Sequence, residues 1–269
     1  MGTPLHLQIL ERPVTSILIT LCTSVWAWLN HKQLGYQDVG LSHELVIQNK
    51  QFWRLVTSQV SHVDLVHLLF NMTSLWSLGG YEQGGKNSSL VLQQSLWLLV
   101  GAGLICLAIY HGLIHILHKQ QYRNVTAVGY SAVIFGWMAL LSARGISNFS
   151  IFGLVQLPMS LAPFGALVIT SIIVPRASFV GHLSGILMGY FMAYVIYDIT
   201  MDLWCSLALL ALLLLGVSYS LQDSMSMPAL TIPSMPNFTT FTSTSTMPSD
   251  DIESGANIAL LSSQQNSSH

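Results

Sequence analysis

Charged side chains are scarce in this sequence. Asp, Glu, Lys and Arg together make up 7% of its 269 residues, whereas soluble globular domains carry about 25%. Hydrophobic residues make up 52% of the chain, and the mean hydropathy is +0.57. These values exclude an ordinary water-soluble domain, and we interpret the chain as an all-α, polytopic membrane helix bundle.

Basic residues and cysteines are also few. Nine Lys and Arg residues against eleven Asp and Glu residues give a formal net charge of −2, which argues against a nucleic-acid partner. The three cysteines, Cys22, Cys106 and Cys205, all fall inside apolar runs. This placement is typical of packed or lipid-facing thiols and not of a disulfide framework.

Apolar segments long enough to cross a bilayer recur along the chain. A hydrocarbon core about 30 Å thick needs roughly 20 apolar residues per helix. We predict seven membrane-spanning helices, at 13–30, 60–79, 90–117, 125–143, 151–174, 177–197 and 202–221. Residues 1–221 therefore form the predicted transmembrane domain, and its first helix has no cleavage site that would mark it as a removable leader.

Two segments lie outside these helices. The stretch between the first two mixes charged residues with Phe52 and Trp53, which is typical of a segment resting at the membrane interface. Residues 222–269 are rich in Ser, Thr and Pro and contain no Lys or Arg. They cannot bury enough apolar surface to offset the entropy of ordering, so we predict a disordered tail.

Polar residues within the predicted spans fall at one level. Because consecutive spans alternate in direction, the second, fourth and sixth enter the membrane from the same side. His67, Ser131 and His182 lie five to seven residues into these spans, which corresponds to a depth of roughly 8–11 Å. Intramembrane polar groups are costly and usually mark function.

The residue types suit acyl transfer. A serine hydroxyl becomes a nucleophile when a neighbouring histidine takes its proton, so Ser131 and His182 can form a dyad. His67 and Asn71 share a helix face at i and i+4 and can donate hydrogen bonds to an oxyanion. Asp64, one helical turn before His67, is a possible third member. Each residue alone also has a packing explanation: Ser131 as a small interface residue, and His182 and Asn71 as interhelical hydrogen-bonding groups.

Three motifs together resemble the rhomboid intramembrane serine proteases. They are "HVDLVHLLFN" at 62–71, "GYS" at 129–131 and "GHLSGILMG" at 181–189. Further matching features are "WR" at 53–54, "GGYEQGG" at 79–85 and Phe135. The likeness covers about residues 12–197, and its details most resemble the divergent plant rhomboid-like proteins.

The resemblance implies a six-helix rhomboid core followed by a seventh helix. It implies that Ser131 is the nucleophile and His182 the general base and acid. It further implies that Asn71 and His67, with the backbone N–H of Ser131, form the oxyanion hole. It implies that Gly129 permits a tight approach to the serine and that Phe135 packs on the His182 ring. It also implies that the substrates are transmembrane helices of other proteins in the lipid bilayer, and that no cofactor is needed.

The sequence departs from the family pattern after the serine, where Ala132 replaces the usual glycine. A catalytically inactive rhomboid pseudoprotease that binds membrane proteins and controls their traffic or turnover is therefore the alternative reading. A second alternative is a metal site, because His111, His115 and His118 at i, i+4 and i+7 have a spacing that zinc ligands can adopt. An interfacial polar helix face explains the same spacing, and we expect no metal there.

The N-terminal sequence bears on the compartment. No Arg-rich, Ser-rich presequence is present at the N-terminus, which favours the secretory pathway or the plasma membrane over plastids and mitochondria.

Overall fold

The computed structural model describes residues 4–83, 88–145, 148–151, 155–158, 161–173 and 178–226. They belong to one compact unit, Met1–Pro228, and Ala229–His269 forms a second unit outside the described residues. Residues 222–226 of the predicted disordered tail are the end of a helix that runs from Leu203 to Ser226, and the rest of the tail, from 227 on, lies outside the described residues.

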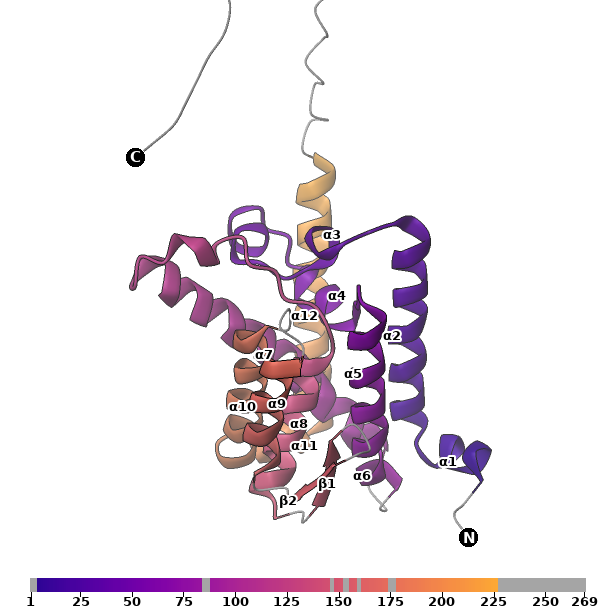
Figure 1. Ribbon diagram of the computed structural model, residues 1–269. Helices are drawn as coiled ribbons and strands as arrows, with labels where there is room; N and C mark the ends of the chain where they lie inside the picture. The colour runs from indigo at the N-terminus through magenta and orange to yellow at the C-terminus, as the bar shows by residue number, and fades with distance from the viewer. Residues whose placement is uncertain are drawn as a thin grey trace, which may run out of the picture. The chain divides into compact units, whose positions relative to one another are not determined.

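The described part of this unit is built almost entirely of helices (Figure 1). The α-helices are α1 (Leu5–Glu11), α2 (Pro13–Lys32), α3 (Tyr36–Val39), α4 (Arg54–Val60), α5 (Leu65–Leu78), α6 (Gly80–Gln83), α7 (Ser88–His115), α8 (Ser131–Ala143), α9 (Ala162–Ile173), α10 (Phe179–Tyr194), α11 (Tyr197–Met201) and α12 (Leu203–Ser226). A π-helix (Glu44–Gln48), a 3₁₀ turn (Gln120–Tyr122) and the short strands β1 (Asn148–Ile151) and β2 (Val155–Pro158) complete the elements.

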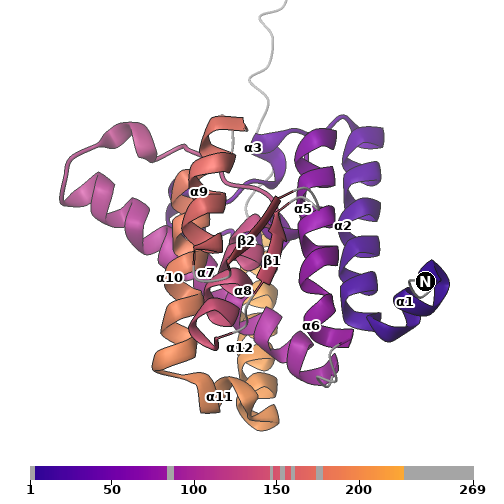
Figure 2. The ribbon, with the colours of Figure 1, turned by 60° about the horizontal axis from the view of Figure 1, so that its bottom comes forward.

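Every predicted membrane segment contains a helix, which confirms the all-α membrane bundle. Within the described ranges, three helices are long and apolar enough to cross a bilayer, at Pro13–Lys32, Ser88–His115 and Leu203–Gln222. Helices α5, α8, α9 and α10 are shorter than predicted. The fifth segment departs most, because β1 and β2 pair antiparallel before α9 begins at Ala162. This hairpin lies between α5 and α9 (Figure 2).

Helix α8 is the centre of the bundle. It packs against α5, α7, α9 and α10, and every residue from Val133 to Leu141 is buried. Helices α2 and α5 lie side by side at the edge of the bundle (Figure 2). Helix α12, which corresponds to the seventh predicted span, packs against α7. There the Trp97 indole N–H donates to the Ser206 hydroxyl at 3.1 Å.

Glycines permit the closest contact in the bundle, between α8 and α10. A Cβ on Gly185 would lie 2.0 Å from the carbonyl oxygen of Ala132, and one on Gly189 would lie 2.2 Å from that of Gly136. The two backbones therefore touch along one helix face, as the Gly185-x-x-x-Gly189 spacing predicts. This contact sets the distance between side chains at the start of α8 and those on α10.

The predicted position of the polar residues within their helices is wrong. His67, Ser131 and His182 lie in the first turns of α5, α8 and α10, not five to seven residues inside them. The chain ahead of Ser131 is not helical because its backbone groups bond elsewhere. Ala127 exchanges two backbone hydrogen bonds of 2.9 Å with Leu41, and the Gly129 N–H donates to the Ser58 carbonyl oxygen at 2.9 Å. Irregular backbone inside a membrane protein requires such partners.

Glu82, in the short helix α6 that follows α5, is hydrogen-bonded to the start of α2. Its buried carboxylate accepts hydrogen bonds from the Val14 N–H at 2.9 Å, the Thr15 N–H at 3.0 Å and the Thr15 hydroxyl at 2.8 Å. These N–H groups belong to the first turn of α2 and have no acceptor within that helix. Burial alone raises the pKa of Glu82, but the hydrogen bonds outweigh it and leave the pKa below the ordinary value of 4.5.

We expect Glu82→Ala to destabilise the protein by roughly 2–4 kcal/mol, because charge-assisted bonds are lost and buried donors are left unpaired. The measurement is the apparent melting temperature in detergent micelles. Glu82→Gln, which keeps an oxygen acceptor, is the matched control, and its melting temperature should lie between those of the wild type and Glu82→Ala. Since the folded pKa is lowered, the contribution of Glu82 is present above the unfolded pKa and is lost as the pH falls through the folded pKa. An Ala variant that melts with the wild type would contradict this role.

Candidate active site

Ser131 stands at the first position of α8, after a sharp change in backbone direction. Gly129 has φ +108°, a backbone conformation that residues with a side chain rarely adopt. A Cβ at Gly129 would also lie 2.6 Å from Cε1 of His67. Glycine is therefore required at position 129 both by the backbone conformation and by the imidazole that lies over it. The turn brings the Ser131 hydroxyl to the N-terminal end of the helix.

Ser131 and His182 meet directly. His182 Nε2 lies 3.0 Å from Ser131 Oγ, within hydrogen-bond distance. His182 is the fourth residue of α10, whose start is capped by the Ser178 hydroxyl accepting from the Gly181 N–H at 3.0 Å. The Phe135 ring, one turn after the serine, stacks on the imidazole with centroids 4.4 Å apart and planes at 19°. These contacts hold the His182 ring against the serine.

Thr170 on α9 contacts the other ring nitrogen of His182, a contact that the sequence did not indicate. Its Oγ1 lies 3.4 Å from His182 Nδ1 and 2.8 Å from the carbonyl oxygen of Ala166. A hydroxyl that donates its hydrogen to that carbonyl can only accept from Nδ1–H. This tautomer leaves Nε2 unprotonated and able to accept the Ser131 proton.

His67 and Asn71 lie on the α5 face beside the serine. The His67 ring covers Gly129 and lies close enough to His182 for electrostatic interaction. The Asn71 side-chain nitrogen donates to the His67 carbonyl oxygen at 2.9 Å, which occupies one of its two N–H bonds. Both residues are buried. Neither hydrogen-bonds to Ser131, whose hydroxyl contacts His182.

His62 is a second residue that sequence reasoning missed. It is fully buried, and its Nε2 accepts a hydrogen bond from the Tyr130 backbone N–H at 3.3 Å. Its ring lies edge-on to His67, with centroids 5.3 Å apart. His62 therefore positions both the residue before the serine and the imidazole over Gly129. Its place at the start of the "HVDLVHLLFN" motif was the available signal.

Asp64 is not a third member of the dyad. It is the N-cap of α5, and its carboxylate accepts from the His67 backbone N–H at 3.0 Å. Within the described residues no carboxylate contacts His182. The two residues that touch the His182 side chain through polar atoms are Ser131 and Thr170.

Ala132 occupies ordinary α-helix. It is the second residue of α8 and does not have a positive φ, so the position does not require the conformational freedom of glycine. Its backbone is the surface against which Gly185 packs. The added methyl group is tolerated by the backbone and changes only the shape of the space beside Ser131.

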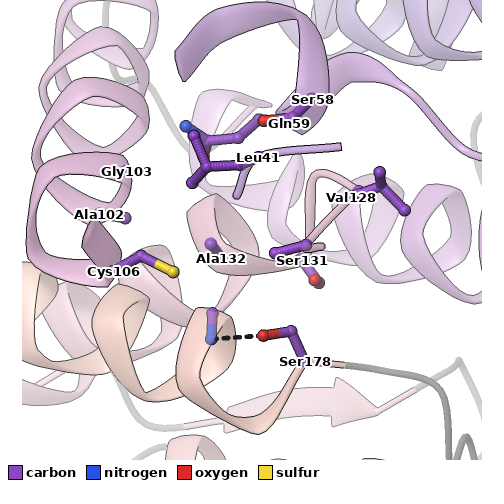
Figure 3. A pocket seen from close by; sticks show the side chains of 13 residues that line it. Leu41, Ser58, Gln59, Ala102, Gly103, Cys106, Val128, Ser131, Ala132 and Ser178 are labelled. Atoms are coloured by element: carbon purple, nitrogen blue, oxygen red, sulfur yellow. Dashed lines mark hydrogen bonds between the residues drawn. The ribbon is translucent and has the colours of Figure 1, made fainter. Parts of the chain in front are cut away.

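A small cavity adjoins the serine (Figure 3). Its volume is about 30 Å³, which is enough for a water molecule. Its walls come from the loop at Leu41, from α4, α7 and α8, and from Ser178 at the start of α10. Ser58 and Gln59 of α4 supply polar groups, whereas Ala132 supplies part of the apolar wall.

The comparisons with known proteins point to one family. A family model described as the rhomboid domain matches residues 49–199. Rhomboid-like protein 14, mitochondrial, of Arabidopsis thaliana is 31% identical over 189 residues, covering 66% of this chain and 54% of that protein.

Two further relatives match a similar share of the chain. Rhomboid-like protein 15 of the same plant is 28% identical over 194 residues, covering 70% of this chain and 48% of the relative. Rhomboid-related protein 4 of Homo sapiens is 32% identical over 181 residues, covering 66% and 55%. The chain thus spans about half the length of the curated relatives it matches, and the expected likeness to plant rhomboid-like proteins is confirmed.

Proposed function

The chain belongs to the rhomboid family of integral membrane proteins, and from this membership we propose that it is an intramembrane serine endopeptidase with Ser131 as nucleophile and His182 as general base. The observation that carries the proposal is the 3.0 Å separation of Ser131 Oγ and His182 Nε2. Phe135 and Thr170 support it, because they fix the orientation and tautomer that this chemistry needs.

The first half of the reaction forms an acyl-enzyme. His182 Nε2 takes the Ser131 proton while Oγ attacks the scissile carbonyl carbon, and the carbonyl oxygen becomes an oxyanion. The protonated His182 then gives its proton to the leaving amine as the C–N bond breaks. In the second half a water attacks the ester carbonyl and His182 takes its proton. His182 then returns this proton to Ser131 Oγ as the ester bond breaks, which releases the carboxylic acid and restores the free serine. The cavity beside Ser131 has room for that water.

We assign the stabilisation of the oxyanion to three groups. The Ser131 backbone N–H belongs to the first turn of α8, where N–H groups have no intrahelical acceptor and the helix dipole favours negative charge. The second Asn71 side-chain N–H and the His67 imidazole come from the neighbouring α5 face. Donors of this kind contribute on the order of 10²–10³-fold in rate each.

We propose transmembrane helices of other proteins as the substrates. The helices that carry the site lie in an apolar bundle, which supports a substrate that is itself a membrane segment. The compartment stays a prediction: the sequence favours the secretory pathway or plasma membrane, while one relative carries "mitochondrial" in its name.

Ala132 is the feature that favours a pseudoprotease, and a fluorophosphonate probe tests it. If the dyad is active, the probe phosphorus bonds to Ser131 Oγ and fluoride leaves, so wild type is labelled and Ser131→Ala is not. We expect Ala132→Gly to raise turnover by less than about fivefold, because the helical backbone at this position accepts either residue within about 1 kcal/mol. A folded wild type that resists the probe while Ala132→Gly is labelled would favour the pseudoprotease.

A further inference from the structure

Three histidines gather where the loop after α2 meets the end of α7. They are His43, from the loop, and His111 and His115, from the last turns of the helix, and their nearest ring nitrogens all lie within 4.8 Å of one another. The sequence pattern had grouped His118 with the latter two, and this grouping is wrong. Helix α7 ends at His115, and His118 follows with φ +52°, so it no longer continues the helical face.

The spacing of the ring nitrogens suits a tetrahedral metal ion. His43 Nε2 lies 3.2 Å from His111 Nδ1. Two nitrogens bound to zinc at about 2.0–2.1 Å with a tetrahedral angle lie roughly 3.3 Å apart. A hydrogen bond between two imidazoles explains this pair equally well, but it does not explain the third. The His115 ring centroid lies 4.3 Å from that of His111 and 5.7 Å from that of His43.

The three side chains differ in burial in a way that suits a site opening to water. His43 is 1% exposed, and its Nδ1 has no hydrogen-bond partner in the described part of the chain. His111 and His115 are exposed and lie at the end of α7, which the charged residues Lys119 and Arg123 follow. This end of the helix therefore lies toward water, so an ion can enter from their side and hold a water as a fourth ligand.

The surrounding charges do not prevent a cation from binding. Arg123 lies near His43, but its guanidinium is 3.4 Å from the carboxylate of Glu44. Glu44 directly follows His43 in the sequence, and its negative charge offsets the positive charge of Arg123 beside the three histidines.

We propose that His43, His111 and His115 bind one divalent transition-metal ion, with Zn²⁺ as the expected metal. Imidazole nitrogens suit zinc, copper and nickel, and three protein ligands with one open position form a familiar zinc coordination. The site is separate from Ser131 and His182 and does not depend on whether the chain is a protease.

A bound ion would link the segment that carries His43 to the end of α7, and through the hydrogen bonds of that segment to residues 123–127. His43 lies between Leu41, which pairs with Ala127, and Glu44, whose N–H donates to the Arg123 carbonyl oxygen at 3.2 Å. The segment 123–127 leads directly to Gly129 and Ser131. An ion bound to His43 and to the end of α7 therefore restrains the chain that precedes the serine, and metal binding should raise the thermal stability of the protein.

The test uses the purified full-length chain in detergent micelles, prepared without a polyhistidine tag and stripped with a chelator. We titrate it with Co²⁺, whose visible absorption reports four-coordinate geometry, and then displace the Co²⁺ with Zn²⁺. Wild type should bind one equivalent, and Zn²⁺ should raise its melting temperature. His111→Ala and His115→Ala alter exposed side chains, so they should fold normally and lose affinity by about 100-fold or more.

His118→Asn is the matched control, because asparagine tolerates a positive φ and His118 lies outside the cluster. It should bind like wild type. The proposal is overturned if wild type binds no Co²⁺ or Zn²⁺ at micromolar concentration. It is also overturned if His111→Ala and His118→Asn lose affinity equally, or if all variants bind equally, which would indicate adventitious surface binding. None of these readouts needs proteolysis.

Discussion

Ser131→Ala is expected to abolish cleavage of a transmembrane substrate while leaving the folded protein intact. The change removes one oxygen atom from a half-buried position in the first turn of α8, where alanine is a good helix former. Loss of a serine nucleophile lowers turnover on the order of 10⁴–10⁶-fold. The measurement is cleavage of a fluorescent transmembrane substrate by protein reconstituted in liposomes.

Ser184→Ala is the matched control for this change. Ser184 is buried on α10, two residues after His182, and its hydroxyl donates to a carbonyl oxygen of its own helix, that of Val180, at 2.6 Å. It should cleave at nearly the wild-type rate. Equal cleavage by Ser131→Ala and wild type would rule out Ser131 as the nucleophile.

The helical order of the bundle could be predicted because hydropathy reports the membrane-buried segments directly. The lengths of the short helices could not. Helix α8 begins at Ser131 because Leu41, Ser58 and His62 take up the backbone groups of the preceding residues. These partners lie about 70 to 90 positions away, and no local periodicity reveals them.

The same reason separates the predicted site residues from the missed ones. Ser131 and His182 stood out because polar groups are rare in apolar helices. Thr170 and His62 did not, since a threonine on an apolar helix and a histidine in a loop are both common. Their importance comes from the partners they meet in the fold. His43 is a similar case, because it lies far from His111 and His115 in the sequence. The regular spacing in the sequence pointed to His118 instead, and His118 is excluded because α7 ends before it.

His182→Ala is expected to be as inactive as Ser131→Ala, because the serine then has no base to take its proton. The double variant should lose little more activity than either single variant, since residues that act as one unit are strongly non-additive. An additive loss in the double variant would show that the two side chains act independently, and their 3.0 Å contact would then be structural.

Removing the imidazole also leaves a cavity against Phe135, which could lower stability by itself. His182→Gln separates the two effects, because it keeps a polar side chain of similar size without a group that accepts and returns protons near neutral pH. We expect His182→Gln to melt near the wild-type temperature and to remain inactive. Substantial cleavage by this variant would mean that another group supplies the base. Thr170 is not a candidate for that group, because its hydroxyl has no suitable pKa. An inactive, folded His182→Gln is therefore the result expected if His182 acts as the general base through its contact with Ser131.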